Sequence, residues 1–192
     1  MTKLPPFAEY QAQIIVGTIL SPMKDTVREH EMSEKPTQLH IRPITAADAD
    51  AVCAMSLNFR HYLEALGDTD DYQFNRARYL QDGFGPDPAF GGFLAVLNDE
   101  AVGYLLHCPS YNSDLACREL MVIDLWVEPA GRRHGVGKGL MQAAGDLARR
   151  RGATRLIWSV FKPNHLAYDF YHRIGGEMIE ELDWMTLPLS RD

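Results

Sequence analysis

The stretch VEPAGRRHGVGKGLM, residues 127–141, holds the clearest set of residues that could bind a ligand. The apolar run before it predicts a buried strand, and the periodicity after it predicts a helix. The first N–H groups of a helix lack intrahelical acceptors and carry partial positive charge, so a turn at this place suits an anion. Glycines at alternate positions would let the backbone approach that anion closely; they are Gly135, Gly137 and Gly139.

Positive charge surrounds the same glycines, from Arg132, Arg133 and Lys138. We interpret the turn as a phosphate or pyrophosphate site; the alternative is a glycine-rich turn without a ligand. A P-loop requires GxxxxGK followed by Ser or Thr, but Gly131 and Gly137 are one residue too far apart. A dinucleotide fingerprint requires GxGxxG, but this turn reads GxGxG and lies late in the chain. Both familiar phosphate-binding motifs are therefore excluded.

A different family matches. The spacing Arg132-x-x-Gly135-x-Gly137 resembles the R/Q-x-x-G-x-G/A motif of the GCN5-related N-acetyltransferases (GNATs). A second stretch, NHLAYDFYHRIGG, resembles their N-x-x-A-x-x-F/L-Y-x-x-x-G motif at Asn164, Ala167, Phe170, Tyr171 and Gly175. The resemblance covers about residues 39–189. The segments IDLWV and ELDWMTLPL are most similar to the diamine (spermidine/spermine) acetyltransferase-like branch.

The resemblance implies acetyl-CoA as co-substrate and no metal. Its pyrophosphate would lie beside Arg132, on backbone N–H groups of Arg133, His134, Gly135, Val136, Gly137, Lys138 and Gly139. It also implies a bulge in the preceding strand, which would free a backbone N–H near Trp126 or Val127 for the acetyl carbonyl. For the side chain of Trp126 the alternative is ordinary core packing. Asn164 would contact the pantetheine arm, cap a helix, or do both.

Acetyl transfer to an amine needs a neutral amine, a polarised thioester carbonyl and a proton for the leaving thiolate. Tyr171 occupies the motif position of the family's general acid; the alternative is a core aromatic on a helix face. Asp124 is the candidate base, although Ile123 stands where the diamine branch has a glutamate before this aspartate. An unpaired carboxylate in this apolar strand would be costly, so Asp124 needs a partner or an open cleft. Glu119 and bulk-like water are the alternative proton acceptors.

These residues predict an acetyl-CoA-dependent N-acetyltransferase that acts on a primary amine of a small molecule by direct attack on the thioester. The alternatives are a protein or peptide N-acetyltransferase and a catalytically silent acyl-CoA-binding module. Acidic residues of the presumed substrate loops suit a cationic amine, or form a solvated face; they are Glu64, Asp68, Asp70, Asp71 and Asp114.

Composition narrows the class of protein. The chain has 192 residues, a net charge of −7 and 46% hydrophobic residues, which is typical of a globular domain that binds neither nucleic acid nor membrane. Its cysteines, Cys53, Cys108 and Cys117, lack paired spacing, so we expect a reducing, cytoplasmic location. No apolar run approaches the ~20 residues of a membrane span.

Periodicity predicts an α/β (α+β) domain with a mixed, mostly antiparallel sheet of six to seven strands and about four helices. We expect residues 1–36 to form a partly irregular extension, with Met32 as a plausible natural start, and residues 37–192 to form the acetyltransferase domain. The strand over residues 119–127 should be buried on both faces. A last strand over residues 184–189 would leave an apolar edge, which predicts a homodimer, although Pro188 limits the pairing.

Overall fold

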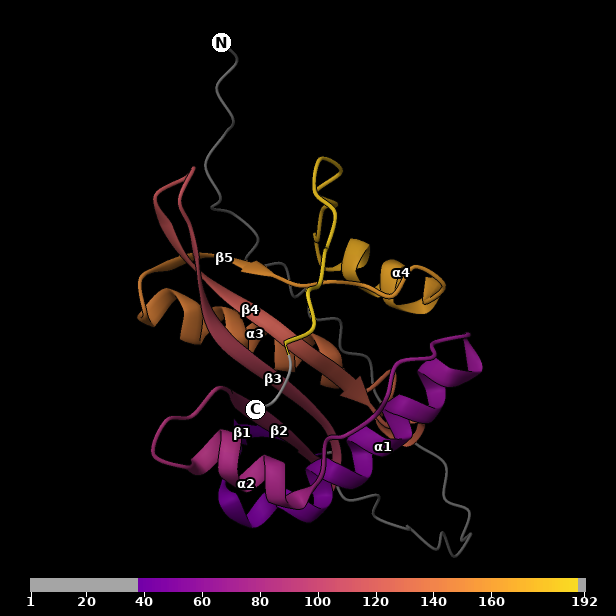
Figure 1. The fold of residues 1–192 in the computed structure, drawn as a ribbon. Coiled ribbons are helices and arrows are strands. Elements are labelled where there is room, and N and C mark those ends of the chain that lie inside the picture. Colours follow the sequence, from indigo (N-terminus) through magenta and orange to yellow (C-terminus); the bar gives the residue numbers. More distant parts are fainter. Residues whose placement is uncertain (1–37, 190–192) are drawn as a thin grey trace, which may run out of the picture. The chain divides into compact units, whose positions relative to one another are not determined.

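The computed structural model describes residues 38–189, in which one mixed sheet forms the centre of the domain (Figure 1). The strands lie in the order β1-β2-β3-β4-β5. Neighbouring strands run antiparallel except β4 and β5, which are parallel. Their bounds are Leu39–Pro43 for β1, Gly91–Leu97 for β2, Glu100–Asn112 for β3, Cys117–Val127 for β4 and Ala153–Ile157 for β5. The predicted fold class is confirmed, but the described residues form five strands and not six to seven.

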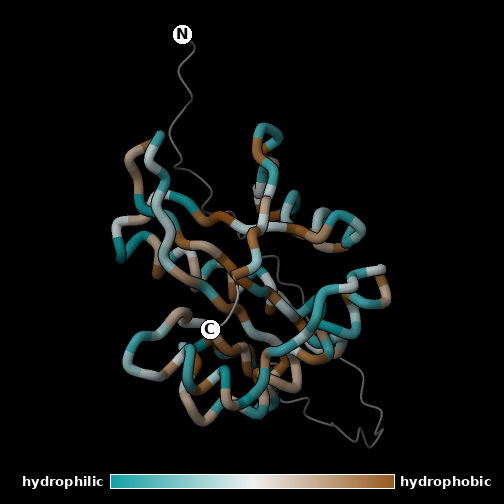
Figure 2. Tube along the Cα trace, viewed as in Figure 1, coloured by the Kyte–Doolittle hydropathy of each residue, from teal (hydrophilic) through white to brown (hydrophobic). Residues whose placement is uncertain are grey.

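Four α-helices cover the two faces of this sheet, as the periodicity predicts. They are α1 (Ala49–Ala65), α2 (Arg76–Phe84), α3 (Val136–Arg150) and α4 (His165–Arg173). One hydrophobic core lies between α3 and the sheet, and a second lies between the sheet and the pair α1 and α2. Figure 2 shows the hydrophobic residues along the central strands and hydrophilic residues at loop tips and outer helix surfaces. Each central strand therefore presents apolar side chains to both faces.

The predicted strand over residues 184–189 is wrong. The chain from Gly176 to Leu189 forms no helix or strand, and its large apolar side chains are exposed. A β-strand needs a neighbour to accept its backbone hydrogen bonds, and no strand of the described residues pairs with this segment. Pro188 also removes one backbone donor from it. The predicted extension over residues 1–36 and the proposed start at Met32 lie outside the described residues.

A two-residue turn joins β2 to β3, where the sequence predicts a hairpin. Asn98 and Asp99 both have positive φ, 51° and 69°. Type I′ turns require positive φ at both central residues, and Asn and Asp tolerate that conformation better than most residues. The turn sets the first two pairs of β2 and β3, Leu97 with Glu100 and Val96 with Ala101, and the extra residue Val102 then shifts the register by one.

A buried carboxylate stabilises the start of the first helix. Asp48 accepts the backbone N–H of Thr45 (2.7 Å) and its hydroxyl (2.8 Å), which forms the capping box that Thr45 followed three residues later by Asp48 predicts. The Arg42 guanidinium also donates two bonds of 2.7 Å to the same carboxylate. The hydrogen bonds from Arg42 lower the pKa of Asp48 to about 2. This pair holds β1 against the 3₁₀ turn (Ala46–Asp48) that leads into α1.

The Asp48 pair predicts a specific pH dependence of stability. The folded pKa of about 2 lies below the ordinary value of 3.8, so the stabilisation is fully present above the unfolded pKa and is lost as pH falls through the folded one. We expect Asp48→Asn to lower the free energy of unfolding at neutral pH by about 2 kcal/mol. The deficit should shrink in acid. Asp50→Asn, which breaks only an exposed pair with Arg76, should change little and serves as the control in urea denaturation. Equal losses in both variants would contradict this role.

Candidate active site

A bulge in β4 sets the geometry of the candidate site. Leu106 of β3 pairs with Asp124, whereas the next residue, His107, pairs with Val122. Ile123 is therefore an extra residue without a partner on β3, as the bulge implied by the resemblance requires. Its side chain is 45% exposed, so the prediction that this strand is buried on both faces is wrong at this position.

The extra residue reverses the facing of every later side chain in β4. Leu120 and Val122 belong to the core under α3. Trp126 belongs to the core under α1 and α2, and Asp124 shares its parity. Side chains alternate with a period of two, so one inserted residue moves the following residues to the opposite face. The bulge thus turns Asp124 away from α3 and toward the α1–α2 side.

Beyond the bulge, β4 also loses its neighbour β5. The last paired residues of these strands are Met121 and Ile157. Glu128 donates its N–H to Val102 on β3 (2.8 Å), so by alternation the N–H of Trp126 also faces β3. The N–H groups of Leu125 and Val127 then face the open edge. The alternation along the strand therefore favours Val127 over Trp126 as the residue that supplies a free N–H.

The glycine turn, residues 131–139, lies where β4 ends. The first N–H of α3 that finds a helical acceptor is that of Gly139, which donates to Gly135 (2.9 Å). The N–H groups of Val136, Gly137 and Lys138 therefore have no intrahelical partner. The four residues before Val136 are all exposed. Such an open, donor-rich helix start fits the pyrophosphate of acetyl-CoA.

The three glycines of the turn serve different purposes. Gly135 has a φ of +77° with open space around it, so backbone conformation selects glycine there. A Cβ on Gly137 would lie 3.2 Å from Phe170, and one on Gly139 would lie 2.5 Å from Ile41. At these two positions the absent side chain lets α3 pack against its neighbours. Each of the three glycines thus has a conformational or packing reason, and the expectation that they make room for a ligand stays a prediction.

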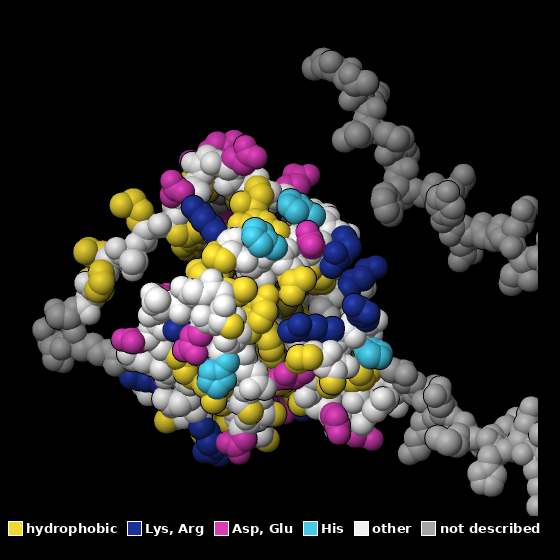
Figure 3. Space-filling model, turned by 90° about the vertical axis from the view of Figure 1, so that its right-hand side faces the viewer, with side chains coloured by type: hydrophobic (Ala, Val, Ile, Leu, Met, Phe, Trp, Pro, Cys, Tyr) yellow, Lys and Arg dark blue, Asp and Glu magenta, His cyan; other side chains and the backbone are white. Residues whose placement is uncertain are grey.

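Basic side chains give the turn its charge. Arg133 and Lys138 are exposed, whereas Arg132 is also bound to the protein. Arg132 donates its Nε–H to the carbonyl of Val127 (3.1 Å), and its guanidinium lies 5.1 Å from the ring centre of Trp126. On the face shown in Figure 3, Lys and Arg side chains gather beside a strip of hydrophobic ones. Arg132 fastens the strand end to the turn and adds positive charge.

Two further predicted residues are His134 in the turn and Trp126 in β4. His134 Nδ1 lies 2.9 Å from the carbonyl oxygen of Arg132, and its ring is exposed. Trp126 is buried against Phe59 and Tyr62, with ring centres 5.3 and 5.5 Å away. The side chain of Trp126 therefore packs in the core, which is the alternative that the sequence analysis gave for it. Its indole N–H finds no acceptor among the described residues.

Asp124 has a hydrogen-bond partner, which a carboxylate in apolar surroundings needs. The hydroxyl of Tyr104 on β3 lies 3.3 Å from Asp124 Oδ2. Burial raises the pKa of Asp124 above its ordinary value, and the hydrogen bond from Tyr104 opposes that rise. The result is a stronger base than an exposed aspartate. Sequence reasoning missed Tyr104 because its contact with Asp124 depends on the bulge.

Tyr171, the second candidate catalytic residue, lies near Asp124. Its ring packs on Trp158 with ring centres 4.9 Å apart. Burial, and then the charge of Asp124, raises the pKa of Tyr171 to about 12. The phenol therefore keeps its proton at physiological pH. Tertiary structure thus brings together the acid and the base candidates from α4 and β4.

Asn164 caps α4 and also contacts α1. Its Oδ1 accepts the N–H of Ala167 (3.2 Å) and the hydroxyl of Tyr62 (2.9 Å). The predicted helix cap is confirmed. Tyr62 was missed, although Phe59 and Tyr62 at i, i+3 share a face of the α1 helix, which is the one signal that could have pointed to it. Through Asn164 and Tyr62, α4 is tied to the helix on the opposite side of the site.

Glu119, the alternative base, is engaged elsewhere. It is 5% exposed, and its Oε1 accepts bonds of 2.9 and 2.6 Å from the Arg155 guanidinium across the β4–β5 pair. This pairing suits a structural ion pair and favours Asp124 as the base. Among residues 38–189, no group of three or more His, Cys, Asp or Glu side chains could hold a metal ion.

Comparisons with known proteins agree with this geometry. The model of the acetyltransferase (GNAT) family matches residues 56–176. An L-ornithine N5-acetyltransferase of Arabidopsis thaliana is 34% identical over 108 residues, which cover 55% of this chain and 46% of the relative. A thialysine N-epsilon-acetyltransferase of Caenorhabditis elegans is 31% identical over 103 residues, 53% of this chain and 64% of the relative. The chain thus matches less than two thirds of the length of either relative.

Solved structures share the fold. The aminoglycoside N-acetyltransferase AAC(6')-Iy in complex with CoA superimposes with a TM-score of 0.63 at 16% identity, over 82% of this chain and 100% of the other. A probable acetyltransferase gives a TM-score of 0.64 at 24% identity, over 80% of this chain and 99% of the other. At these identities the likeness concerns the fold alone.

Proposed function

The chain belongs to the GNAT acetyltransferase family, and from this premise we propose that it transfers the acetyl group of acetyl-CoA to a primary amine of a small molecule by direct attack on the thioester. One observation carries the proposal: β4 has a bulge at Ile123 and no pairing with β5 after Met121, next to the donor-rich start of α3. This open edge has a half-buried carboxylate, Asp124, and a protonated phenol, Tyr171, in its surroundings.

The polypeptide supplies binding and orientation. Bound acetyl-CoA would contribute an activated thioester. The free N–H groups at the start of α3 hold the pyrophosphate, with charge from Arg132, Arg133 and Lys138, while Asn164 borders the pantetheine arm. The N–H of Val127 on the open edge of β4 donates to the acetyl oxygen and stabilises negative charge there.

Two side chains handle protons. Asp124 accepts a proton from the amine, which must be neutral to attack, and its raised pKa makes it a better base than an exposed carboxylate. Tyr171 keeps its hydroxyl proton and directs it at the leaving sulfur. Its pKa of about 12 makes it a weaker acid than a free phenol, so its first contribution is a hydrogen bond to the departing thiolate.

The charges near the site favour a small cationic amine over a polyamine. Asp124 is a single half-buried carboxylate, and Ile123 beside it is apolar. Of the acidic loop residues, Glu64 and Asp68 are both paired with Arg60. Arg60 offsets one of these two negative charges, which weakens their attraction for a second ammonium group. The relatives named for ornithine and thialysine acetylation act on amino acid side chains, a class of substrate consistent with this balance.

The location of the protein in the cell stays a prediction. Within residues 38–189, no helix is both long enough and apolar enough to span a membrane. Cys53, Cys108 and Cys117 are free thiols. We propose a cytoplasmic location, where such thiols stay reduced.

Release of CoA thiol from acetyl-CoA tests the activity. The purified chain is incubated with ornithine, thialysine, spermidine, lysine and an aminoglycoside, and product mass identifies the acetylated nitrogen. Amine-dependent thiol release supports the enzyme. Binding of acetyl-CoA without release for any amine would favour a silent acyl-CoA-binding module, and acetylation of peptides alone would favour a protein acetyltransferase.

Tyr171→Phe should lower kcat about 10²-fold and leave acetyl-CoA affinity nearly unchanged, because only a positioned proton donor is lost. Tyr168→Phe on the same helix is the matched control, since its ring packs on His172. Steady-state kinetics with the best amine of the panel measures both. Turnover within about threefold of wild type in Tyr171→Phe would remove this hydroxyl from the mechanism, provided that chemistry limits the rate.

Gly135→Val should weaken acetyl-CoA binding by about tenfold or more, because a side chain at positive φ distorts the donors that face the pyrophosphate. Gly152→Val is the matched control. Gly152 follows the other end of α3 with a φ of +73° and similar open space, so the backbone strain is alike but the ligand site is not touched. Calorimetric titration compares the two. Equal affinities in both folded variants would refute the pyrophosphate site.

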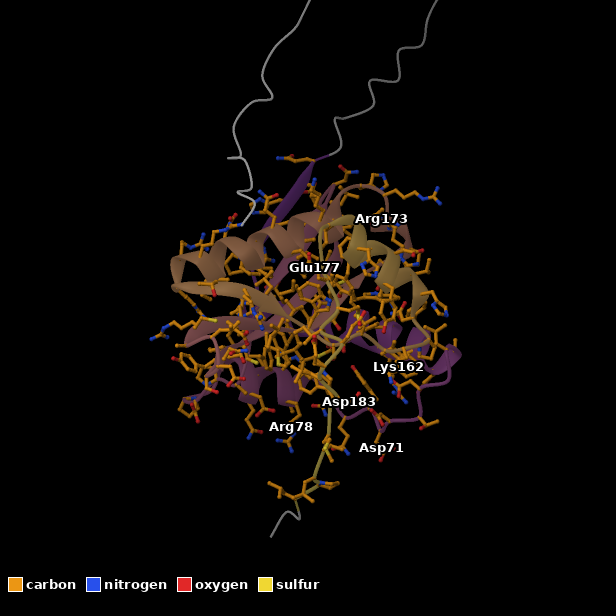
Figure 4. All side chains as sticks on the ribbon, turned by 90° about the horizontal axis from the view of Figure 1, so that it is seen from above. Asp71, Arg78, Lys162, Arg173, Glu177 and Asp183 are labelled. Carbon is orange, nitrogen blue, oxygen red and sulfur yellow. The ribbon has the colours of Figure 1, made fainter. Side chains whose placement is uncertain are left out.

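We also propose a homodimer formed through the C-terminal segment. Glu177 and Asp183 in Figure 4 mark the course of this segment from α4 toward the side of the sheet that carries α2, as Figure 1 also shows. Its apolar side chains are 69–95% exposed at Leu182, Trp184, Met185, Leu187 and Leu189. Sedimentation at micromolar concentration should give the mass of two chains, and Trp184→Glu with Leu187→Glu should give one. A monomeric wild-type mass would contradict the proposal.

A further inference from the structure

Tyr104 on β3 is a buried tyrosine whose hydroxyl bonds to the site. The side chain is fully buried in the core between the sheet and the helices α1 and α2. A phenol hydroxyl in such a place needs a hydrogen-bond partner. Its partner is Asp124 Oδ2, at 3.3 Å. The bulge at Ile123 creates this contact, because it puts Asp124 on the face of the sheet where Tyr104 already lies.

A second buried tyrosine in the same core shows what a purely structural hydroxyl does. Tyr79 on α2 is also fully buried, and its hydroxyl donates to the backbone carbonyl of Thr45 (2.8 Å). That bond ties α2 to the turn before α1 and does not involve Asp124 or Tyr171. The hydroxyl of Tyr104 instead bonds to the carboxylate of Asp124, which belongs to the site.

We propose that Tyr104 is a positioning residue for acetyl transfer: its hydroxyl holds the carboxylate of Asp124 in one orientation and keeps it ionised for the incoming amine. The catalytic meaning of this bond rests on the proposed function. The bond itself, and its effect on Asp124, can be tested without turnover.

The surroundings of Asp124 make this bond consequential. Burial is the main cause that raises the pKa of Asp124, and the Tyr104 hydrogen bond is the cause that lowers it. The titratable groups that face the carboxylate are phenols: Tyr104 from β3, Tyr171 from α4 and Tyr72 from the segment before α2. From α1 comes the uncharged hydroxyl of Ser56, which lies beside Tyr72 and Tyr104. With no cation among these neighbours, the hydroxyl of Tyr104 carries much of the stabilisation of the charge.

The direct test is a titration of Asp124 in the ligand-free chain. Protein labelled with ¹³C at the aspartate carboxyl is titrated by NMR, and Asp124→Asn identifies the resonance. Tyr104→Phe should raise the pKa of Asp124 by about one unit, the scale of losing one hydrogen bond to a charged group. Tyr79→Phe deletes the same atom elsewhere in the same core and should leave the titration in place.

Kinetics supply the functional readout, with the best amine of the panel. In Tyr104→Phe the carboxylate stays protonated to higher pH, so the acidic limb of kcat/KM should move to higher pH by the same amount as the NMR midpoint. The loss should be about tenfold on the acidic side and should shrink toward alkaline pH. Because the amine is the same for both proteins, its own titration cannot produce the difference. Adding Tyr104→Phe to Asp124→Asn should cause little further loss.

An unchanged Asp124 midpoint in Tyr104→Phe, or an equal shift in Tyr79→Phe, would overturn the proposal whether or not any amine is acetylated. If Tyr104→Phe does not fold, wild-type protein labelled with ¹³C at the tyrosine Cζ supplies the answer. A tyrosine resonance that persists in both Tyr171→Phe and Tyr72→Phe should then move with the Asp124 midpoint in wild type and stay constant in Asp124→Asn. Absence of such a coupled resonance would equally overturn the proposal. Failure of the amine panel alone would instead count against the proposed function.

Discussion

One inserted residue in β4 shapes the site. Ile123 has no partner on β3. The side chains after it change face, which moves Asp124 toward α1 and α2. The pairing of β4 with β5 ends at Met121, two residues before Ile123, so the edge of β4 beyond that point keeps unpaired N–H groups. A regular strand would have buried Asp124 under α3, among the apolar side chains of that core.

The change of face leaves the carboxylate of Asp124 among apolar side chains, and a nearby hydrogen-bond donor stabilises it. A buried carboxylate without a partner is strongly unfavourable. Asp48 shows one solution, in which Arg42 and Thr45 supply donors and lower its pKa to about 2. Asp124 shows another, in which a single phenol donates and burial still raises the pKa. The first solution gives stability, and the second leaves a carboxylate that can still take up a proton.

Residues near the ligand site also hold the fold together, so sequence motifs there combine two kinds of constraint. Arg132 contributes charge to the glycine turn and fastens Val127 and Trp126. Gly137 and Gly139 permit close packing of α3 on Phe170 and Ile41. Asn164 caps α4 and receives the hydroxyl of Tyr62 from α1. A motif match therefore identifies the region of the site without separating ligand contacts from packing contacts.

Local sequence determined much of this protein. Periodicity and caps gave the four helices, including the capping box at Thr45 and the cap at Asn164, because these depend on residues close in the chain. The glycine turn and its charges were readable for the same reason. The number of strands could not be read from the sequence. The predicted strand over residues 184–189 needed a neighbouring strand, and the described residues do not provide one. Tertiary structure alone decided that Tyr104 meets Asp124 and that Arg155 engages Glu119. Those contacts join residues far apart in the chain, and they depend on register, which a single bulge changes and which no local pattern encodes.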